Sequence, residues 1–408
     1  MWYNGSIKGG DNMKIIERKY LQELIDVMYT PDIKVITGVR RSGKSKLLEQ
    51  FQEYVINNVC DANVISINYN SLDYEEYMEY HKLNDYVKER YRAEKRNFVL
   101  IDEVQMCAGF EKTINSLHSS GNFDIYITGS NAFLLSSDLS TLFTGRTYEI
   151  EVYPFSLKEY MVYNDYDDSE QAFKRYVLEG GMAGSYLYND NIKKYNYLKD
   201  VYDTLILRDI KQKYKIRNND LLLSLSDYLM DNISNLTSSR SIEKQYLKNG
   251  VKFDHKTINN YMNYFCYAFA FYRVRRYDIQ GKKYLSAQDK YYIVDQAFKY
   301  AKIGTKNMNY GRIYENLVAI ELLRRGYEIY VGILYNKEID FVAIRQNEKI
   351  YIQVSDNIEE QKTFDREVEP LLRINDAYPK ILIANTKHDT YQYEGISIID
   401  ISRWLISE

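Results

Sequence analysis

Residues 33–51 read IKVITGVRRSGKSKLLEQF, and this stretch decides the fold of the N-terminal part of the chain. The apolar run 33–37 predicts a short buried strand, and residues 46–51 predict the start of a helix. Between them stands the pattern GxxxxGKS, whose glycines let backbone N–H groups turn toward phosphate oxygens while the helix N-terminus adds its dipole. We therefore predict a phosphate-binding loop (P-loop) on a parallel α/β sheet. A glycine-rich turn without a ligand is the alternative, and the flanking strand and helix argue against it.

The loop residues predict a site for ATP and Mg2+. Lys44 would reach the β- and γ-phosphates, and Ser45 would hold Mg2+. The residues expected to contact the nucleotide are those of the loop and the one after it: Gly38, Val39, Arg40, Arg41, Ser42, Gly43, Lys44, Ser45 and Lys46.

A second buried strand should supply the carboxylates on the metal side of the site. Residues 97–103 read NFVLIDE, which is a Walker B segment. Asp102 would orient Mg2+ through its water shell, and Glu103 would polarise the attacking water as general base. Two carboxylates at a strand exit that simply meets solvent are the alternative, and the nearby P-loop pattern disfavours it.

Two further segments offer candidate catalytic side chains. Residues 123–131, FDIYITGSN, predict a third strand, and we expect Asn131 or Ser130 at its end to sense the γ-phosphate, unless this is an ordinary strand exit. Arg146 follows a glycine in the segment FTGR, where its guanidinium could reach transition-state charge in the same chain or from a neighbouring subunit. A surface salt bridge is the alternative for Arg146.

Composition limits the other possibilities. With 408 residues, 45% hydrophobic and 27% charged, the chain suits two or three globular domains of about 150 residues each. It has neither a run of 18 apolar residues nor an export signal, so we expect no membrane span and a cytoplasmic location. The three cysteines lack CxxC spacing, which argues against disulfides and zinc, and the net charge of −3 gives no overall attraction to nucleic acid. Residues 1–12 are expected to be a leader or a disordered segment before a start near Met13.

The middle of the chain predicts helices followed by a hairpin. Helical patterns at 195–213, 220–233, 241–248 and from 255 onward precede two expected strands at 271–277 and 282–285, which suggests a winged helix. The hairpin 271–285 mixes tyrosines with basic residues, so double-stranded DNA is a candidate partner. A lid or a protein-docking surface is the alternative, because exposed edge strands commonly carry basic residues. The basic residues are Arg273, Arg275, Arg276, Lys282 and Lys283.

The last hundred residues predict a helix and strands in an order that resembles the PD-(D/E)XK nuclease fold. Glu315, Asp340 and Gln353 stand at three positions that bind Mg2+ in active members of that fold, but Ser355 stands at the lysine position. Metal-dependent cleavage is therefore not expected, and a scaffold for binding or dimerisation is favoured. Lys337 or Lys349 could replace the missing lysine in space.

Seven ordered segments together resemble one family. They are GVRRSGKS, FVLIDEVQ, YITGSN, FTGR, YEIEVYPFSLKEY, LEGGMAG and TLILRDI, and the resemblance runs from about Met13 to the end. The chain is identified by them as similar to prokaryotic AAA-type ATP-binding proteins of the AAA_14/DUF4143 family, which implies ATP binding and an AAA-like fold.

From these observations we expect an α/β protein with a P-loop NTPase sheet of the AAA-like ASCE type (additional strand, catalytic glutamate). The expected activity is that of an ATPase acting as a nucleotide-driven switch or remodelling factor on a protein or DNA partner, with homo-oligomerisation as one option. The alternative is an ATPase coupled to DNA binding or cleavage by the nuclease-like domain. The expected parts are the P-loop core 13–160, a helical lid 161–215, a winged-helix-like module 216–305 and a PD-(D/E)XK-like α/β domain 306–408.

Overall fold

The computed structural model describes residues 14–129, 143, 145–248, 250, 253–305 and 308–407. Contacts divide the chain into two compact units, one of Ile15–Tyr153 with Tyr267–Phe269 and one of Pro154–Cys266 with Ala270–Glu408.

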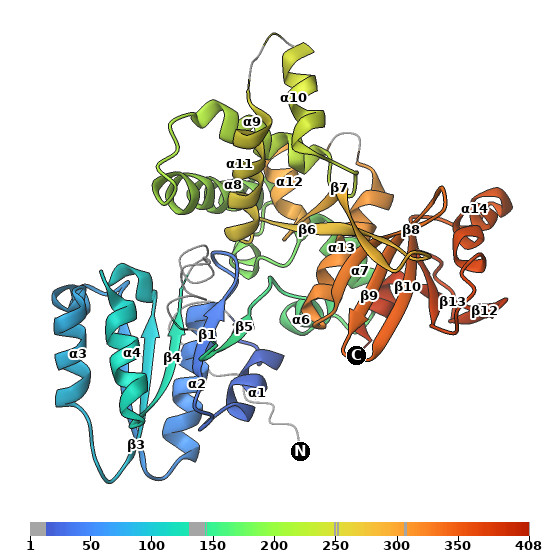
Figure 1. The fold of residues 1–408 in the computed structure, drawn as a ribbon. Helices are drawn as coiled ribbons and strands as arrows, with labels where there is room; N and C mark the ends of the chain where they lie inside the picture. The colour runs from blue at the N-terminus through green and yellow to red at the C-terminus, as the bar shows by residue number, and fades with distance from the viewer. Residues whose placement is uncertain are drawn as a thin grey trace. The chain divides into compact units, whose positions relative to one another are not determined.

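The first unit is built on a parallel sheet of five strands in the order β2-β3-β4-β1-β5 (Figure 1). Strand β4 lies between β1 and β3 and pairs in parallel with both, which confirms the expected P-loop NTPase sheet with an additional strand. The strands are β1 (Ile33–Thr37), β2 (Ala62–Asn68), β3 (Arg96–Asp102), β4 (Phe123–Thr128) and β5 (Thr147–Glu151).

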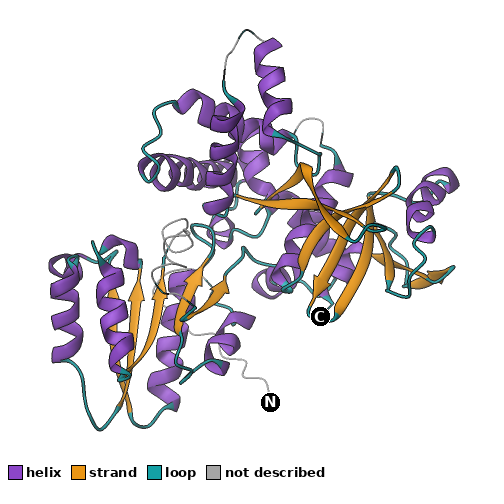
Figure 2. Ribbon diagram, in the orientation of Figure 1, coloured by secondary structure: helices purple, strands orange, loops and turns teal. Residues whose placement is uncertain are grey.

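Helices cover both faces of this sheet (Figure 2). Val35 and Ile101 pack on one face with residues of α3 and α4, while Ile36 and Leu100 pack on the other face with residues of α1 and α2. Because both faces are buried, the central strands read as continuous apolar runs in the sequence. The helices are α1 (Lys19–Asp26), α2 (Lys44–Asn58), α3 (Tyr80–Glu89) and α4 (Phe110–Ser120).

The second unit contains a mixed sheet of eight strands in the order β12-β13-β11-β10-β9-β8-β6-β7. Strand β6 pairs antiparallel with β7 and in parallel with β8, so the basic hairpin is hydrogen-bonded into the same sheet as the strands that follow residue 305. The strands are β6 (Phe271–Asp278), β7 (Lys283–Ile293), β8 (Glu328–Leu334), β9 (Lys337–Arg345), β10 (Glu348–Ser355), β11 (Lys380–Ala384), β12 (Tyr391–Tyr393) and β13 (Ile396–Asp400).

Helices make up the rest of the second unit. Strand β7 continues to Ile293, well beyond the predicted strand end at residue 285. The helices are α6 (Leu157–Asn164), α7 (Ser169–Glu179), α8 (Asn191–Thr204) continued by a π-helical segment (Leu205–Gln212), α9 (Asn219–Asp231), α10 (Ser239–Lys248), α11 (His255–Tyr267), α12 (Gln296–Ile303), α13 (Tyr310–Arg324), α14 (Gln361–Leu372) and α15 (Ile401–Ile406).

The two glycines of the LEGGMAG segment lie where the backbone passes close to other atoms. A Cβ atom on Gly180 would stand 2.0 Å from Oδ1 of Asp295, and one on Gly181 would stand 2.3 Å from the carbonyl oxygen of Phe155. Asp295 accepts hydrogen bonds from the N–H groups of Gly181 at 2.7 Å and Ala297 at 2.8 Å. Burial raises the pKa of Asp295 to about 6, although these hydrogen bonds oppose the shift. This glycine pair therefore has a packing role.

Candidate nucleotide-binding site

The P-loop connects the end of β1 to the start of α2, as the sequence predicts. Gly38 has φ 125° and Gly43 has φ 101°, values that glycine adopts without the steric cost of a side chain. A Cβ atom on Gly38 would lie 2.2 Å from the carbonyl oxygen of Val152, so only glycine fits there. Gly43 stands at the N-cap of α2, where the unpaired N–H groups of the helix are available to an anion.

The side chain of Lys44 is held inside the loop. Its residue is only 5% exposed, and Nζ donates hydrogen bonds to the carbonyl oxygens of Gly38 at 2.9 Å and Val39 at 3.0 Å. The hydroxyl oxygen of Ser42 is also buried, and no hydrogen-bond partner for it occurs among the described residues. The loop thus concentrates a positive charge and an unused polar atom at the helix N-terminus.

The outer residues of the predicted contact set are more exposed. Arg40 is half-buried, while Arg41 and Lys46 are exposed at the loop surface. Lys46 forms an ion pair of 2.8 Å with Glu49 on the same helix. The buried residues of the predicted contact set therefore lie around Lys44, whereas Arg40, Arg41 and Lys46 lie at the edge of the loop.

Arg18 lies outside the P-loop motif and forms hydrogen bonds that hold the loop in place. The sequence analysis did not predict this role. Its guanidinium donates hydrogen bonds to the carbonyl oxygens of Ser42 and Tyr153, both at 2.8 Å. The residue is 6% exposed, so both hydrogen bonds are shielded from water. Only the three-dimensional contact shows this role, since Arg18 is an ordinary polar residue before α1 in the sequence.

Asp102 ends β3 next to Ser45. One carboxylate oxygen, Oδ1, accepts hydrogen bonds from Ser45 Oγ at 3.1 Å and from Thr128 Oγ1. The other oxygen, Oδ2, is buried and has no hydrogen-bond partner among the described residues. Burial raises the pKa of Asp102, and the two hydroxyl hydrogen bonds partly oppose this. A carboxylate oxygen that is buried and unused, beside a serine hydroxyl, fits the oxygen ligands that Mg2+ prefers.

Glu103 follows in an unusual backbone conformation. With φ 56° and ψ 46° it lies in the left-handed region, which a residue other than glycine occupies at a cost. Its N–H donates a hydrogen bond to Thr128 Oγ1 at 3.1 Å, and its carboxylate accepts one from the side chain of Gln105. Thr128, at the end of β4, thus touches both acidic residues, and the sequence analysis did not single it out.

The remaining predicted catalytic residues are not brought to this cluster. Asn131 and Ser130 lie outside the described residues. Arg146 is exposed, and its carbonyl oxygen accepts a hydrogen bond of 2.8 Å from the N–H of Ile33, at the start of β1. The P-loop begins after the other end of this strand, and five residues at about 3.3 Å each place Arg146 roughly 16 Å away. The structure therefore does not bring Arg146 to the loop of its own chain.

The nuclease-like positions in the second unit have an additional partner. Lys290 of β7 forms ion pairs with Glu315 at 2.8 Å and with Asp340 at 3.5 Å. Gln353 is engaged at both ends, because its side-chain oxygen accepts from the N–H of Asp340 and its nitrogen donates to Glu367. Ser355 donates to the carbonyl oxygen of residue 357.

The lysines proposed to replace the missing one lie elsewhere. Lys337 pairs with Glu369 at 3.0 Å, and Lys349 lies 4.0 Å from Asp376. Neither forms a salt bridge with Asp340 in the part of the chain that the structure describes. The lysine that does pair with Asp340 is Lys290, and the sequence analysis did not predict this contact.

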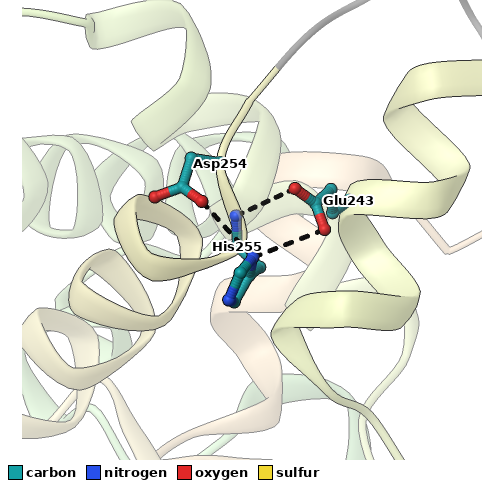
Figure 3. A group of neighbouring side chains, drawn as sticks. All are labelled: Glu243, Asp254 and His255. Carbon is teal, nitrogen blue, oxygen red and sulfur yellow. Dashed lines mark hydrogen bonds and ion pairs between the residues drawn. The ribbon is translucent and has the colours of Figure 1, made fainter.

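A third group of potential ligands lies at the start of α11 (Figure 3). The ligand atoms of Glu243, Asp254 and His255 all lie within 4.8 Å of one another. Glu243 also accepts a hydrogen bond from the backbone N–H of His255 at 3.3 Å. This N–H begins a helix and has no partner within it, so the group acts as a cap.

Within the described residues, no helix is both long and apolar enough to cross a membrane.

Two family models match parts of this chain. The family model of an AAA domain, AAA_14, matches residues 30–161, and the model of a domain of unknown function, DUF8612, matches residues 170–309. The second model is a different domain of unknown function from the DUF4143 named by the sequence-based expectation. The AAA match covers the P-loop, Asp102 and Glu103.

Among solved structures, domain III of the replication initiation protein DnaA from Thermotoga maritima aligns with 45% of this chain and 90% of its own, at 20% identity and a TM-score of 0.31. The ORC1 protein of Aeropyrum pernix, solved in complex with DNA, aligns with 75% of this chain and 92% of its own, at 10% identity and a TM-score of 0.30.

Two relatives match nearly the full length of the chain. An uncharacterised protein of Methanocaldococcus jannaschii is 29% identical over 416 residues, covering 96% of this chain and 90% of that protein. An uncharacterised protein of Haemophilus influenzae is 36% identical over 398 residues, covering 96% of this chain and 98% of that protein. The chain therefore belongs to the family of the Haemophilus influenzae protein, and its residues 30–161 match the model of an AAA domain.

Proposed function

We propose that this protein binds ATP with Mg2+ and hydrolyses it, acting as a nucleotide-driven switch or remodelling factor for a protein or DNA partner. The observation that carries the proposal is the pair formed by Ser45 and Asp102, in which a buried carboxylate oxygen has no hydrogen-bond partner among the described residues. When bound, ATP supplies the phosphoryl group transferred to water, and Mg2+ neutralises charge on the phosphate oxygens.

The loop would hold the phosphates and the metal. The N–H groups at the start of α2 and the ammonium of Lys44 bind negative charge, and the hydroxyl of Ser45 and the carboxylate of Asp102 are the oxygen ligands on the metal side. The hydrogen bonds of Lys44 to the carbonyl oxygens of Gly38 and Val39 keep the ammonium near the place where phosphate oxygens would bind.

Glu103 would take the proton from the attacking water. Its backbone is fixed by Thr128 and its carboxylate is oriented by Gln105. A general base held in the correct orientation typically raises the rate of the chemical step by roughly 10²–10⁴-fold.

The first test measures phosphate release from ATP and Mg2+ and, separately, binding of a fluorescent ATP analogue. Lys44→Ala should abolish nucleotide binding, because the buried ammonium is lost. Glu103→Gln should keep binding and slow hydrolysis by at least about 10²-fold. Glu53→Gln, an exposed acid-to-amide change on α2, is the matched control and should behave as wild type. Normal hydrolysis by Glu103→Gln would exclude this residue as the base.

A second candidate is an ATPase coupled to DNA binding through the hairpin β6–β7. Arg275, Lys282 and Lys283 are exposed, and none of them forms a salt bridge with a described residue. Cations without a paired acid are available to phosphates, and their contribution should fall with salt concentration. This candidate would be favoured if double-stranded DNA stimulates phosphate release by the wild type at low salt and does not stimulate it in Arg275→Ala. Indifference to DNA would favour a protein partner.

A further inference from the structure

The carboxylate cluster of the second unit is organised around a lysine. Lys290 is 3% exposed, and its ammonium lies 2.8 Å from Glu315, 2.8 Å from Glu338 and 3.5 Å from Asp340. The three carboxylates come from α13 and from positions two residues apart on β9, which point to the same face of the strand. One buried cation thus serves three acids that belong to two different elements.

Other donors complete the cluster. Tyr292, two residues after Lys290 on β7, donates its hydroxyl to Oε1 of Glu315 at 2.6 Å. Oδ2 of Asp340 accepts a hydrogen bond from the N–H of Val354 at 2.9 Å. Oε1 of Glu315 and both oxygens of Asp340 therefore already have a cation or donor from the chain beside them. Burial raises the pKa of both acids, and the ammonium of Lys290 opposes this shift.

A nuclease-like fold implies a divalent cation at this place, and the residues present do not fit one. A metal ion held by these three acids would lie beside the carboxylate oxygens that already contact the ammonium of Lys290. Two cations within a few ångströms of each other repel strongly in a buried site, since water screens them little. In addition, Gln353 offers an amide where a carboxylate would be expected, and this amide is already bonded to Asp340 and Glu367.

We propose that the ammonium of Lys290 is the permanent cation of this carboxylate cluster and takes the place of a divalent metal ion, so the cluster is a fixed structural centre that does not bind metal. This inference concerns the second unit alone and does not depend on ATP hydrolysis at the P-loop.

The main test removes the lysine charge and keeps its apolar stem. Lys290→Met leaves three carboxylates without their cation, and its melting temperature should fall by on the order of 10 °C. Mn2+ should then restore much of that loss, because the freed carboxylates can bind it. Wild type and Lys290→Arg, which keeps the charge, should show no such restoration. Lys302→Met is the matched control, since this lysine pairs with one partly exposed acid, Asp203.

The readout is thermal unfolding of nucleotide-free protein with and without Mn2+, together with Tb3+ luminescence, which nearby tyrosines sensitise. All variants are made in a His255→Ala background, so that the group at the start of α11 cannot supply the bound ion. Lys290→Met should gain a Tb3+ signal that the added change Asp340→Asn removes. A folded Lys290→Met protein without metal-dependent stabilisation would overturn the proposal.

A second comparison needs no change at the lysine and remains decisive if Lys290→Met does not fold. Wild type and Asp340→Asn should respond to Mn2+ in the same way, because neither binds it at this cluster. Stabilisation of the wild type by Mn2+ that Asp340→Asn abolishes would show that a metal displaces the ammonium, and the proposal would be wrong.

Discussion

Thr128 offers a direct test of how the catalytic acids are positioned. It is fully buried, and its hydroxyl donates to Asp102 while accepting from the N–H of Glu103 at 3.1 Å. Thr128→Val keeps nearly the same shape but removes the hydroxyl, so neither acidic residue keeps this partner. A hydrogen bond to a charged group is worth about 1.5–3 kcal/mol, which corresponds to roughly 10–10²-fold in rate if the loss falls on the transition state.

The assay separates a positioning role from a loss of stability. For each variant, kcat and KM for ATP are measured by phosphate release, and the folded fraction is measured by urea unfolding. Thr128→Val should lower kcat by about 10–10²-fold with little change in nucleotide affinity, since the hydrogen bonds of the Thr128 hydroxyl go to the two acidic residues. Thr128→Ser restores the hydroxyl and should recover most of the rate. An unchanged kcat in Thr128→Val, or an equal loss in Thr128→Ser, would refute the reasoning.

Two other predictions concern Asp295 and Arg146. Because burial raises the folded-state pKa of Asp295 from 3.8 to about 6, its contribution to stability is fully present below pH 3.8 and is lost as the pH rises through 6, by at most about 3 kcal/mol. The difference in unfolding free energy between wild type and Asp295→Asn, measured by urea unfolding from pH 4 to 7, should follow this curve, and a flat difference would contradict it. Since Arg146 lies beside the start of β1 and the P-loop follows the end of that strand, we expect Arg146 to act from a neighbouring subunit. Mixing the inactive variants Arg146→Ala and Lys44→Ala should then restore hydrolysis, and no restoration from folded proteins would exclude that role.

Much of the nucleotide site could be predicted because its determinants are local. Lys44, Ser45, Asp102 and Glu103 stand in short patterns at strand ends, and parallel strands bring their carboxyl ends to one edge of the sheet. Thr128 is also at such an end, one strand further along, but a threonine closing an apolar run has no distinctive pattern. Its role depends on Asp102 as its hydrogen-bond partner, and the sequence does not show this contact.

The second unit shows a different limit. The small and polar run 286–290, SAQDK, interrupts the apolar pattern of β7, and the predicted strand therefore ends before it, at residue 285. A lysine is usually exposed, and Lys290 is buried only because acids from α13 and β9 surround it. The local sequence pattern could not predict the length of β7 or the burial of Lys290. The acids that compensate the lysine charge come later in the chain.

The pairing of β6 with β8 also decides where the polypeptide can be cut. Three register positions, Arg276 with Val331, Tyr277 with Gly332 and Asp278 with Ile333, join residues on both sides of position 305. A fragment that begins at residue 306 would present β8 as a bare edge, and an uncovered edge strand is a template for pairing with other copies. It would also lack Lys290, leaving the acids of the cluster without their cation. The smallest fragment of this sheet expected to stay monomeric therefore begins before Phe271.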